Sequence, residues 1–297
     1  MNIKGIIPPM ITPFTKDGDV DYEAHRRNIG KWNKEDLAGY LVLGSNSETA
    51  FLTEEEKLKL IELTVSAAGK GKLLLAGTGL ESTRETIRLT NRAAELGVQA
   101  GLILTPNFYG GQMNNEALIN HFRRVADGSR VPILIYNVPA YTHLVISVDA
   151  VAALSEHPNI IGMKDSSGDV PRLAALKGVL PDSFNLIVGS ASALYPALAL
   201  GVRAGILALA NCAGNACAEV QRLYDAGRQE EASGLYRRLV PVNVAVTATY
   251  GVPGLKFAST LFGYESGSVR APLLPLADAQ KKQMEAILVT SGLLVRG

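Results

Sequence analysis

Short runs of consecutive apolar residues alternate along the chain with longer stretches in which apolar and polar residues follow a helical spacing. The apolar runs cover residues 5–9, 39–43, 73–76, 101–104, 133–136, 160–163, 186–188 and 205–209. A run without alternation is typical of a strand that is covered on both faces. Strands that alternate with helices indicate right-handed βαβ units and a parallel sheet.

Capping signals support helices in the intervals between these runs. Two pairs have the spacing of a capping box, Thr53 with Glu56 and Ser82 with Glu85. Three further residues are suited to begin the next helices because their side chains can accept a bond from the first turn: Asn115, Ser147 and Asp169.

Eight βα units in one chain predict a (β/α)₈ TIM barrel. The rival is an open doubly wound sheet, but Gly77-Thr78-Gly79 lacks the third glycine of a dinucleotide-binding loop. After residue 209 the pattern predicts helices over 213–226, 229–246 and 278–288, with a loop over 250–275. We therefore expect a catalytic barrel over 1–225 and a small C-terminal helical region over 226–297.

Composition narrows the range of partners. The chain has 297 residues, 47% of them hydrophobic, and a formal net charge of +1, which favours neither nucleic acid nor a membrane as partner. The most apolar stretch, 193–213, contains Pro196, Gly201 and Arg203, and is typical of a buried helix followed by a strand. Two cysteines and a strand-like start without a targeting segment lead us to expect a cytoplasmic protein.

Lys164 is the first candidate for chemistry, because it ends the apolar run 160–163 just before a small polar loop. Lysine is rarely buried unless it is paired or used, and removal from water favours its uncharged amine. Such an amine is a nucleophile for carbonyl carbons through a Schiff base. The alternative is a side chain that extends from the strand end to water.

Other polar side chains are predicted to meet Lys164, because the active site of a TIM barrel lies at the C-terminal ends of its strands. The second strand brings Ser45 and Asn46 to that end, and the fourth brings Tyr109. The fifth strand brings Tyr136, and the seventh brings Gly189 and Ser190. An amine there can form an imine with a ketone, a tyrosine can move a proton, and a Gly-Ser-Asn turn can hold a carboxylate.

Competing chemistries lack their residues. The four histidines have no metal-ligand spacing, and no Gly-x-Ser-x-Gly motif occurs with a partner histidine. The loops after the last two strands carry no basic cluster, which favours an unphosphorylated substrate. We expect no metal and no cofactor other than the covalent imine on Lys164.

Four motifs resemble one family over essentially the whole chain: Gly44-Ser45-Asn46-Ser47-Glu48, Tyr136-Asn137-Val138-Pro139, Gly162-Met163-Lys164-Asp165 and Gly189-Ser190. The chain is similar to the dihydrodipicolinate synthase / N-acetylneuraminate lyase family of class I, pyruvate-dependent aldolases. The resemblance implies a TIM barrel with a C-terminal helical domain, commonly a homotetramer formed as a dimer of dimers, that acts on a small 2-oxo acid.

The resemblance also implies roles for individual residues. Lys164 would form the Schiff base with the pyruvyl group, and Tyr136 would relay the proton. Ser45 and Asn46 would hold the pyruvyl carboxylate, with Gly189 and Ser190 also at the substrate. Tyr109 matches a tyrosine that reaches into the neighbouring subunit's site.

Departures from the family pattern point to one subgroup. Tyr141 stands where dihydrodipicolinate-forming relatives usually carry an arginine for the second substrate's carboxylate, and a phenol cannot replace a bidentate cation. Phe108 replaces a common tyrosine, and Ser47 a usual glycine. The motifs look most like 4-hydroxy-2-oxoglutarate aldolases, in which Ser166 would also contact substrate.

We therefore predict a lyase that cleaves a 2-oxo acid, with 4-hydroxy-2-oxoglutarate giving pyruvate and glyoxylate. The alternatives are dihydrodipicolinate synthase, which condenses pyruvate with aspartate semialdehyde, and a 2-keto-3-deoxy sugar-acid aldolase. A third alternative, of another class, is a non-catalytic barrel that binds a 2-oxo acid.

Overall fold

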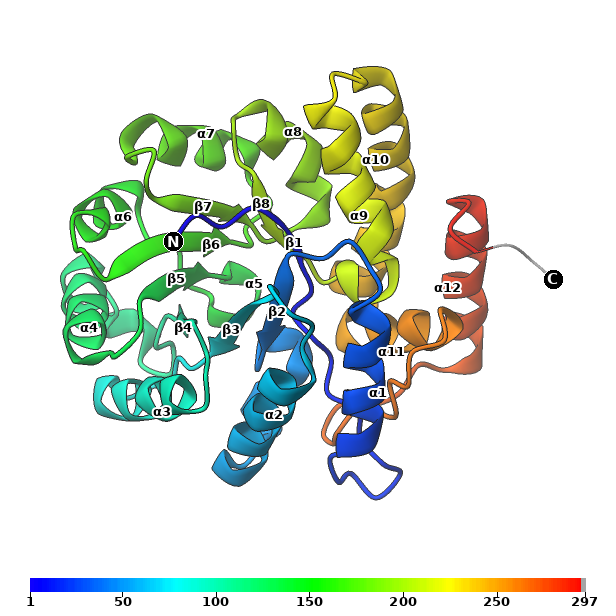
Figure 1. Cartoon of the computed structure of the whole chain (residues 1–297), viewed down its shortest axis with the longest axis horizontal. Helices are drawn as coiled ribbons and strands as arrows, with labels where there is room; N and C mark the ends of the chain where they lie inside the picture. The colour runs from blue at the N-terminus through cyan, green and yellow to red at the C-terminus, as the bar shows by residue number, and fades with distance from the viewer. Residues whose placement is uncertain (295–297) are drawn as a thin grey trace.

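The computed structural model describes residues 1–294, which contain eight parallel strands hydrogen-bonded in the order β1-β8-β7-β6-β5-β4-β3-β2. The backbone after β1 closes the remaining seam, since Met10 N donates to Leu41 O at 2.9 Å. This confirms the predicted (β/α)₈ barrel, drawn in Figure 1. The strands are β1 (Gly5–Ile7), β2 (Gly39–Val42), β3 (Leu73–Gly77), β4 (Ala100–Leu104), β5 (Ile133–Asn137), β6 (Ile160–Asp165), β7 (Asn185–Val188) and β8 (Ala204–Ile206).

Helices follow the strands and surround the barrel (Figure 1). They are α1 (Tyr22–Trp32), α2 (Glu54–Ala67), α3 (Thr83–Glu95), α4 (Asn115–Gly128), α6 (Val148–Ser155), α7 (Val170–Val179), α8 (Leu194–Ala199) and α9 (Ala210–Asp225), with a one-turn α5 (Pro139–Thr142) after β5.

The predicted caps are confirmed in part. Thr53 and Glu56 form a complete capping box on α2. Ser82 accepts from Glu85 N, but the Glu85 carboxylate binds Arg88 instead of returning to the cap, so this box is only half formed. Ser147 and Asp169 cap α6 and α7 as predicted. Asn115 was wrong by one position, because the side chain of Asn114 accepts from the first turn of α4.

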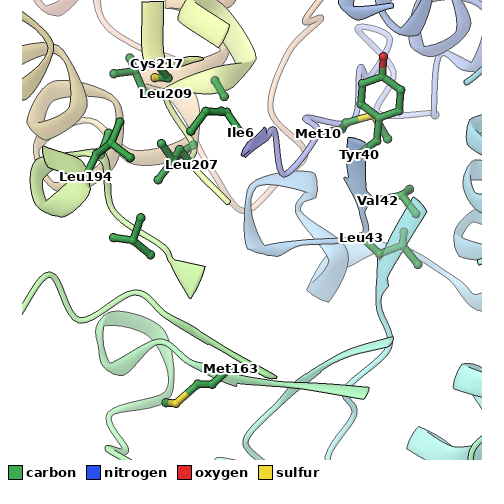
Figure 2. Packing of buried hydrophobic residues seen from close by; sticks show 14 of the residues in the cluster. Ile6, Met10, Tyr40, Val42, Leu43, Met163, Leu194, Leu207, Leu209 and Cys217 are labelled. Carbon is green, nitrogen blue, oxygen red and sulfur yellow. The ribbon is translucent and has the colours of Figure 1, made fainter. Parts of the chain in front are cut away.

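Two layers of apolar side chains form the core. One fills the barrel itself and includes Ile7, Leu41, Leu102 and Leu134. The other lies between the strands and the helices, where Figure 2 places Ile6, Met163 and Leu207 on strands or at their ends. The strands are therefore buried on both faces, which is the reason for their continuous apolar runs.

Of the C-terminal helices, the first two pack against α9 on one side of the barrel and the third packs against those two (Figure 1). They are α10 (Gln229–Val244), which runs on as a π-helical turn η5 (Ala245–Thr249), then α11 (Gly251–Leu261) and α12 (Asp278–Thr290). Our division of the chain at residue 225 into two regions stays a prediction. Within residues 1–294, no helix is both long and apolar enough to cross a membrane.

The loop predicted over 250–275 was wrong in its first half, where α11 forms. Gly251, Pro253 and Gly254 favoured a loop, but proline is tolerated in the first turn of a helix, where its missing N–H has no partner to lose. Tertiary packing then stabilises α11, because Leu255 and Ala258 are fully buried.

Candidate active site

A cavity of about 550 Å³ opens at the C-terminal ends of the barrel strands. Most of the residues selected from the sequence meet there, but Tyr109 is not among them. The lining residues are Ser45, Asn46, Tyr136, Val138, Ala140, Tyr141, Lys164, Ser166, Ser167, Gly189, Ser190, Ala208, Thr247 and Ala248.

Lys164 reaches the cavity from the buried strand β6 and is 3% exposed. Its neighbour in register on β5 is Tyr136, and its Nζ lies 4.2 Å from the centre of the Tyr136 ring. In the described part of the chain, no carboxylate lies within salt-bridge distance of this amine. The side chain is thus buried over most of its length, and its amine, without an ion-pair partner, borders a space that can hold a substrate.

Tyr136 connects the lysine to the turn after β2. Its hydroxyl shares a hydrogen bond of 3.2 Å with Ser45 Oγ, and the tyrosine is 6% exposed. Lys164, Tyr136 and Ser45 thus form a continuous series from an amine to two hydroxyls. A phenol and a hydroxyl in contact can pass a proton between a reacting carbon and the rest of the site.

The turn after β2 is a 3₁₀ segment, Ser45–Ser47, that ends at Glu48. Ser47 occupies the position where the resembled family usually has glycine, and the serine fits there because its Oγ donates to Met10 O at 2.5 Å. Glu48 has a left-handed conformation with φ 55° and is 3% exposed. The turn presents Ser45 and Asn46 to the cavity while Ser47 and Glu48 face inward.

A buried carboxylate holds the loop after β6 in place. Asp165, directly after Lys164, accepts from Arg172 Nε at 2.8 Å and from Asn137 Nδ2 at 3.0 Å, and its other oxygen accepts from Ser167 N at 2.9 Å. These bonds tie the ends of β5 and β6 to α7. They fix the backbone that brings Ser166 and Ser167 into the cavity.

Gly189 is required by close packing at the same place. A Cβ on residue 189 would lie 2.0 Å from Ser166 Oγ and 2.8 Å from Asp165 O. Any larger residue would push the loop after β6 out of position, so Gly189 shapes the cavity through the side chain it lacks.

Tyr141 lies in α5 at the rim of the cavity and exposes 52% of its surface. Desolvation of its hydroxyl raises the pKa of the phenol, and the neighbouring Tyr136 adds to this effect. The side chain at this rim therefore offers a neutral hydrogen-bonding group and an aromatic face.

Tyr109 lies outside the lining of the cavity. It is 68% exposed and packs edge to face on Phe108, which is 77% exposed, with ring centres 5.0 Å apart. Glu81 Oε2 holds this loop by accepting from Asn107 N at 2.9 Å and Phe108 N at 3.0 Å.

Sequence reasoning missed the lining residues that come from the C-terminal region. The π-helical turn η5 carries Thr247 and Ala248 into the cavity, and Asn243 Nδ2 donates to Ser190 Oγ at 3.4 Å and Ser192 Oγ at 2.9 Å. π-Helical turns occur frequently at functional sites. No local pattern marks these residues, because only the docking of α10 on the barrel brings them here.

The side chains that could bind a metal ion are dispersed over the described part of the chain. Among residues 1–294, no three His, Cys, Asp or Glu side chains are grouped so that they could hold a metal ion. Our expectation of catalysis without a metal or further cofactor stays a prediction.

A family model described as the dihydrodipicolinate synthetase family matches residues 2–291. The chain is 34% identical to 4-hydroxy-tetrahydrodipicolinate synthase of Methanothrix thermoacetophila over 287 residues, which cover 96% of each chain. The fold is also similar to that of the chloride-inhibited dihydrodipicolinate synthase of Acinetobacter baumannii, crystallised with pyruvate (TM-score 0.93, 30% identity, 99% of this chain and 100% of that chain). A pyruvate complex of a prophage protein of that family from E. coli gives a TM-score of 0.92 at 27% identity, over 98% and 99% of the two chains.

The barrel and its lysine-containing cavity are those of a class I, pyruvate-dependent aldolase, and the protein is a carbon–carbon lyase. The chain belongs to the dihydrodipicolinate synthetase family.

Proposed function

We propose that Lys164 forms an imine with the ketone of a 2-oxo acid and that Tyr136 moves the proton. The observation that carries this proposal is the unpaired, buried amine 4.2 Å from the Tyr136 ring at the cavity wall. The amine attacks the ketone carbon, water leaves, and the resulting iminium draws electrons from the breaking C3–C4 bond. The phenol system accepts the proton of the 4-hydroxyl and returns one to C3, after which hydrolysis frees pyruvate.

The pyruvyl carboxylate lies in this proposal at the turn that carries Ser45 and Asn46. A hydroxyl and a side-chain amide can donate to both carboxylate oxygens. Two relatives with the same fold were crystallised with pyruvate, which supports a pyruvyl group as the part of the substrate that this site holds.

The remainder of the substrate is proposed to be that of 4-hydroxy-2-oxoglutarate, cleaved to pyruvate and glyoxylate. Beyond Lys164 the cavity of the described chain is lined by hydroxyls and no arginine, with Ser166, Ser190, Thr247 and Tyr141 available to a short polar end. Both 4-hydroxy-2-oxoglutarate and aspartate semialdehyde carry a carboxylate at this end, so in this proposal hydroxyls, and no arginine, hold the carboxylate that leaves with glyoxylate.

The second candidate is the synthase reaction of pyruvate with aspartate semialdehyde, which is favoured by the name of the relatives at 34% identity. The deciding experiment measures kcat/KM for pyruvate release from 4-hydroxy-2-oxoglutarate and from a panel of 2-keto-3-deoxy acids, and compares it with the synthase reaction. We expect the first substrate to give the highest value. A higher value for the synthase reaction would replace our proposal.

Tyr141→Arg tests the rim directly. An arginine at this position adds a bidentate cation for the carboxylate of aspartate semialdehyde, so we expect the synthase kcat/KM to rise by about tenfold or more. Tyr141→Phe is the matched control, because it changes the same side chain without adding charge.

We also propose a homotetramer in which Tyr109 enters the site of a neighbouring subunit. Support comes from the exposed pair Phe108 and Tyr109 on a loop that Glu81 holds in place. Light scattering combined with activity tests this proposal: Tyr109→Phe should lower kcat in an oligomer, whereas a fully active monomer overturns it.

A cytoplasmic location completes the proposal. Cys212 and Cys217 are buried free thiols, and burial raises the pKa of Cys212 to about 12. Free thiols suit a reducing compartment, and localisation of the tagged enzyme by fractionation checks this expectation.

A further inference from the structure

A second buried lysine lies behind the turn that carries Ser45 and Asn46. Lys256, on α11, is 2% exposed, and its Nζ lies 2.6 Å from Oε1 of Glu48. The two side chains come from opposite ends of the chain and are both removed from water. A buried ion pair of this kind holds its two backbone segments at a fixed separation.

Glu48 is the residue that ends the 3₁₀ turn. It adopts φ 55°, a left-handed conformation that non-glycine residues rarely take unless the surroundings hold them there. Both carboxylate oxygens face the C-terminal region: Oε2 accepts from Arg270 N at 2.8 Å, and Oε1 forms a close ion pair with the Lys256 amine although the two atoms are not aligned for a hydrogen bond. The side-chain contacts therefore impose the backbone conformation at the end of the turn.

We propose that Lys256 is a positioning residue for catalysis: by holding Glu48 it places Ser45 and Asn46 against the substrate carboxylate and against Tyr136. The connection runs from Nζ of Lys256 to the Glu48 carboxylate, through the turn to Ser45, and across 3.2 Å to the Tyr136 hydroxyl. The inference rests on the proposed function, and it makes the C-terminal helical region part of the active site's support.

The surroundings of Lys256 determine how strongly its amine depends on Glu48 to stay charged. Its amine also donates to Ser268 O at 2.5 Å and lies 4.4 Å from the centre of the Phe14 ring, where the Arg270 guanidinium lies at the same distance. Burial lowers the pKa of Lys256 to about 8; Glu48 opposes this shift and Arg270 adds to it. The Glu48 carboxylate is thus the main group that keeps this amine charged at neutral pH.

The test uses the full chain with three variants: Lys256→Met, Glu48→Gln and the double variant. The readout is the pyruvate concentration that half-saturates borohydride trapping on Lys164, measured together with kcat and KM. Because displacement of about 1 Å at a binding group can cost about 100-fold, we expect half-saturation to rise between about tenfold and 100-fold in each single variant. The double variant should be no worse than either single one.

Glu265→Gln is the matched control. Glu265 pairs with Arg27 of α1 at 2.6 Å, so it joins the C-terminal segment to the barrel through residues other than Glu48 and Arg270. Its loss should leave pyruvate half-saturation unchanged. Lys256→Arg, which keeps the charge, should restore part of the affinity that Lys256→Met loses.

The outcomes separate the inference from the function it rests on. If the natural chain forms no adduct on Lys164, the proposed function fails. If that adduct forms and folded Lys256→Met has the half-saturation of the natural chain, the positioning role is overturned while the function stands. Should Lys256→Met not fold, Glu48→Gln decides by the same criterion, since it keeps the size of the side chain and removes the charge.

Discussion

Lys164 and Lys256 are two lysines with nearly the same burial and different surroundings. They are 3% and 2% exposed, and each amine lies over an aromatic ring, 4.2 Å from that of Tyr136 and 4.4 Å from that of Phe14. Lys256 has Glu48 at 2.6 Å, whereas Lys164 faces a cavity and has no carboxylate partner in the described residues. Burial therefore does not distinguish the lysine that we propose as the nucleophile; the missing carboxylate partner and the open space beside its amine do.

We expect removal of the two lysines to affect folding differently. A paired buried charge is strongly destabilising only when one partner is removed, because the other is then left without compensation. An unpaired buried amine costs stability in the native protein itself, which is a common property of functional sites. Removal of Lys164 should thus lower activity far more than stability, whereas removal of Lys256 should lower stability strongly.

The largest expected effect is the loss of activity on Lys164→Ala. Removal of a covalent nucleophile should lower kcat by at least about 10⁴-fold while the barrel stays folded. In the natural chain, trapping with pyruvate and borohydride followed by peptide mapping should place the adduct on the Lys164 peptide and none on the Lys256 peptide. An adduct on Lys256 would reverse the roles that we assign to the two amines.

Next in size is the effect of Tyr136→Phe, which keeps the ring beneath Lys164 and removes the proton. General acid–base groups contribute ~10²–10⁴-fold, so kcat should fall by that amount. Tyr40→Phe is the control, since it also removes a buried tyrosine hydroxyl, one that donates to Asn33 Oδ1 at 2.7 Å away from the cavity. A loss below about tenfold at position 136 means that another group relays the proton.

Replacement of each lysine by methionine compares the two sites by their effect on stability. Lys256→Met leaves the Glu48 carboxylate buried and unpaired, which should cost about 3–5 kcal/mol in the free energy of unfolding. Lys164→Met removes an amine without an ion-pair partner, so it should change that free energy by less than about 1 kcal/mol or increase it. Urea unfolding measures both, and equal losses would contradict the distinction between the two sites.

A buried histidine, His25, should make the stability of the protein depend on pH in the acid range. Burial lowers the pKa of His25 to about 4 from 6.5. The native state keeps the ring neutral while the unfolded state binds a proton below pH 6.5, so the stability from this group is complete above that pH. It is lost as the pH falls toward 4, by up to about 3 kcal/mol.

Urea midpoints measured between pH 7 and pH 4 check this expectation. His25→Gln should make the pH dependence shallower. His157→Gln serves as the control, because His157 lies at the surface edge of the barrel beside the exposed Asp127 at 3.0 Å. An unchanged slope in His25→Gln would assign the acid lability to the carboxylates instead.

The sequence by itself determined the barrel and the centre of the site. Each apolar run can be recognised without knowledge of its neighbours, because a strand covered on both faces is continuously apolar. All strands of a TIM barrel run in the same direction, so their C-terminal ends meet at one mouth. The sequence therefore predicts Lys164 and Tyr136 at one mouth, and β5 and β6 bring them into register.

Only the tertiary structure decided what supports that centre. Thr247 enters the cavity through a π-helical turn, α11 forms in a segment rich in glycine and proline, and Lys256 finds Glu48 across the length of the chain. Tyr109, which the sequence places at the mouth, lies outside the cavity lining. Local periodicity reports which face of an element is buried, whereas the partner across that face depends on how distant elements dock, and this docking is a property of the whole fold.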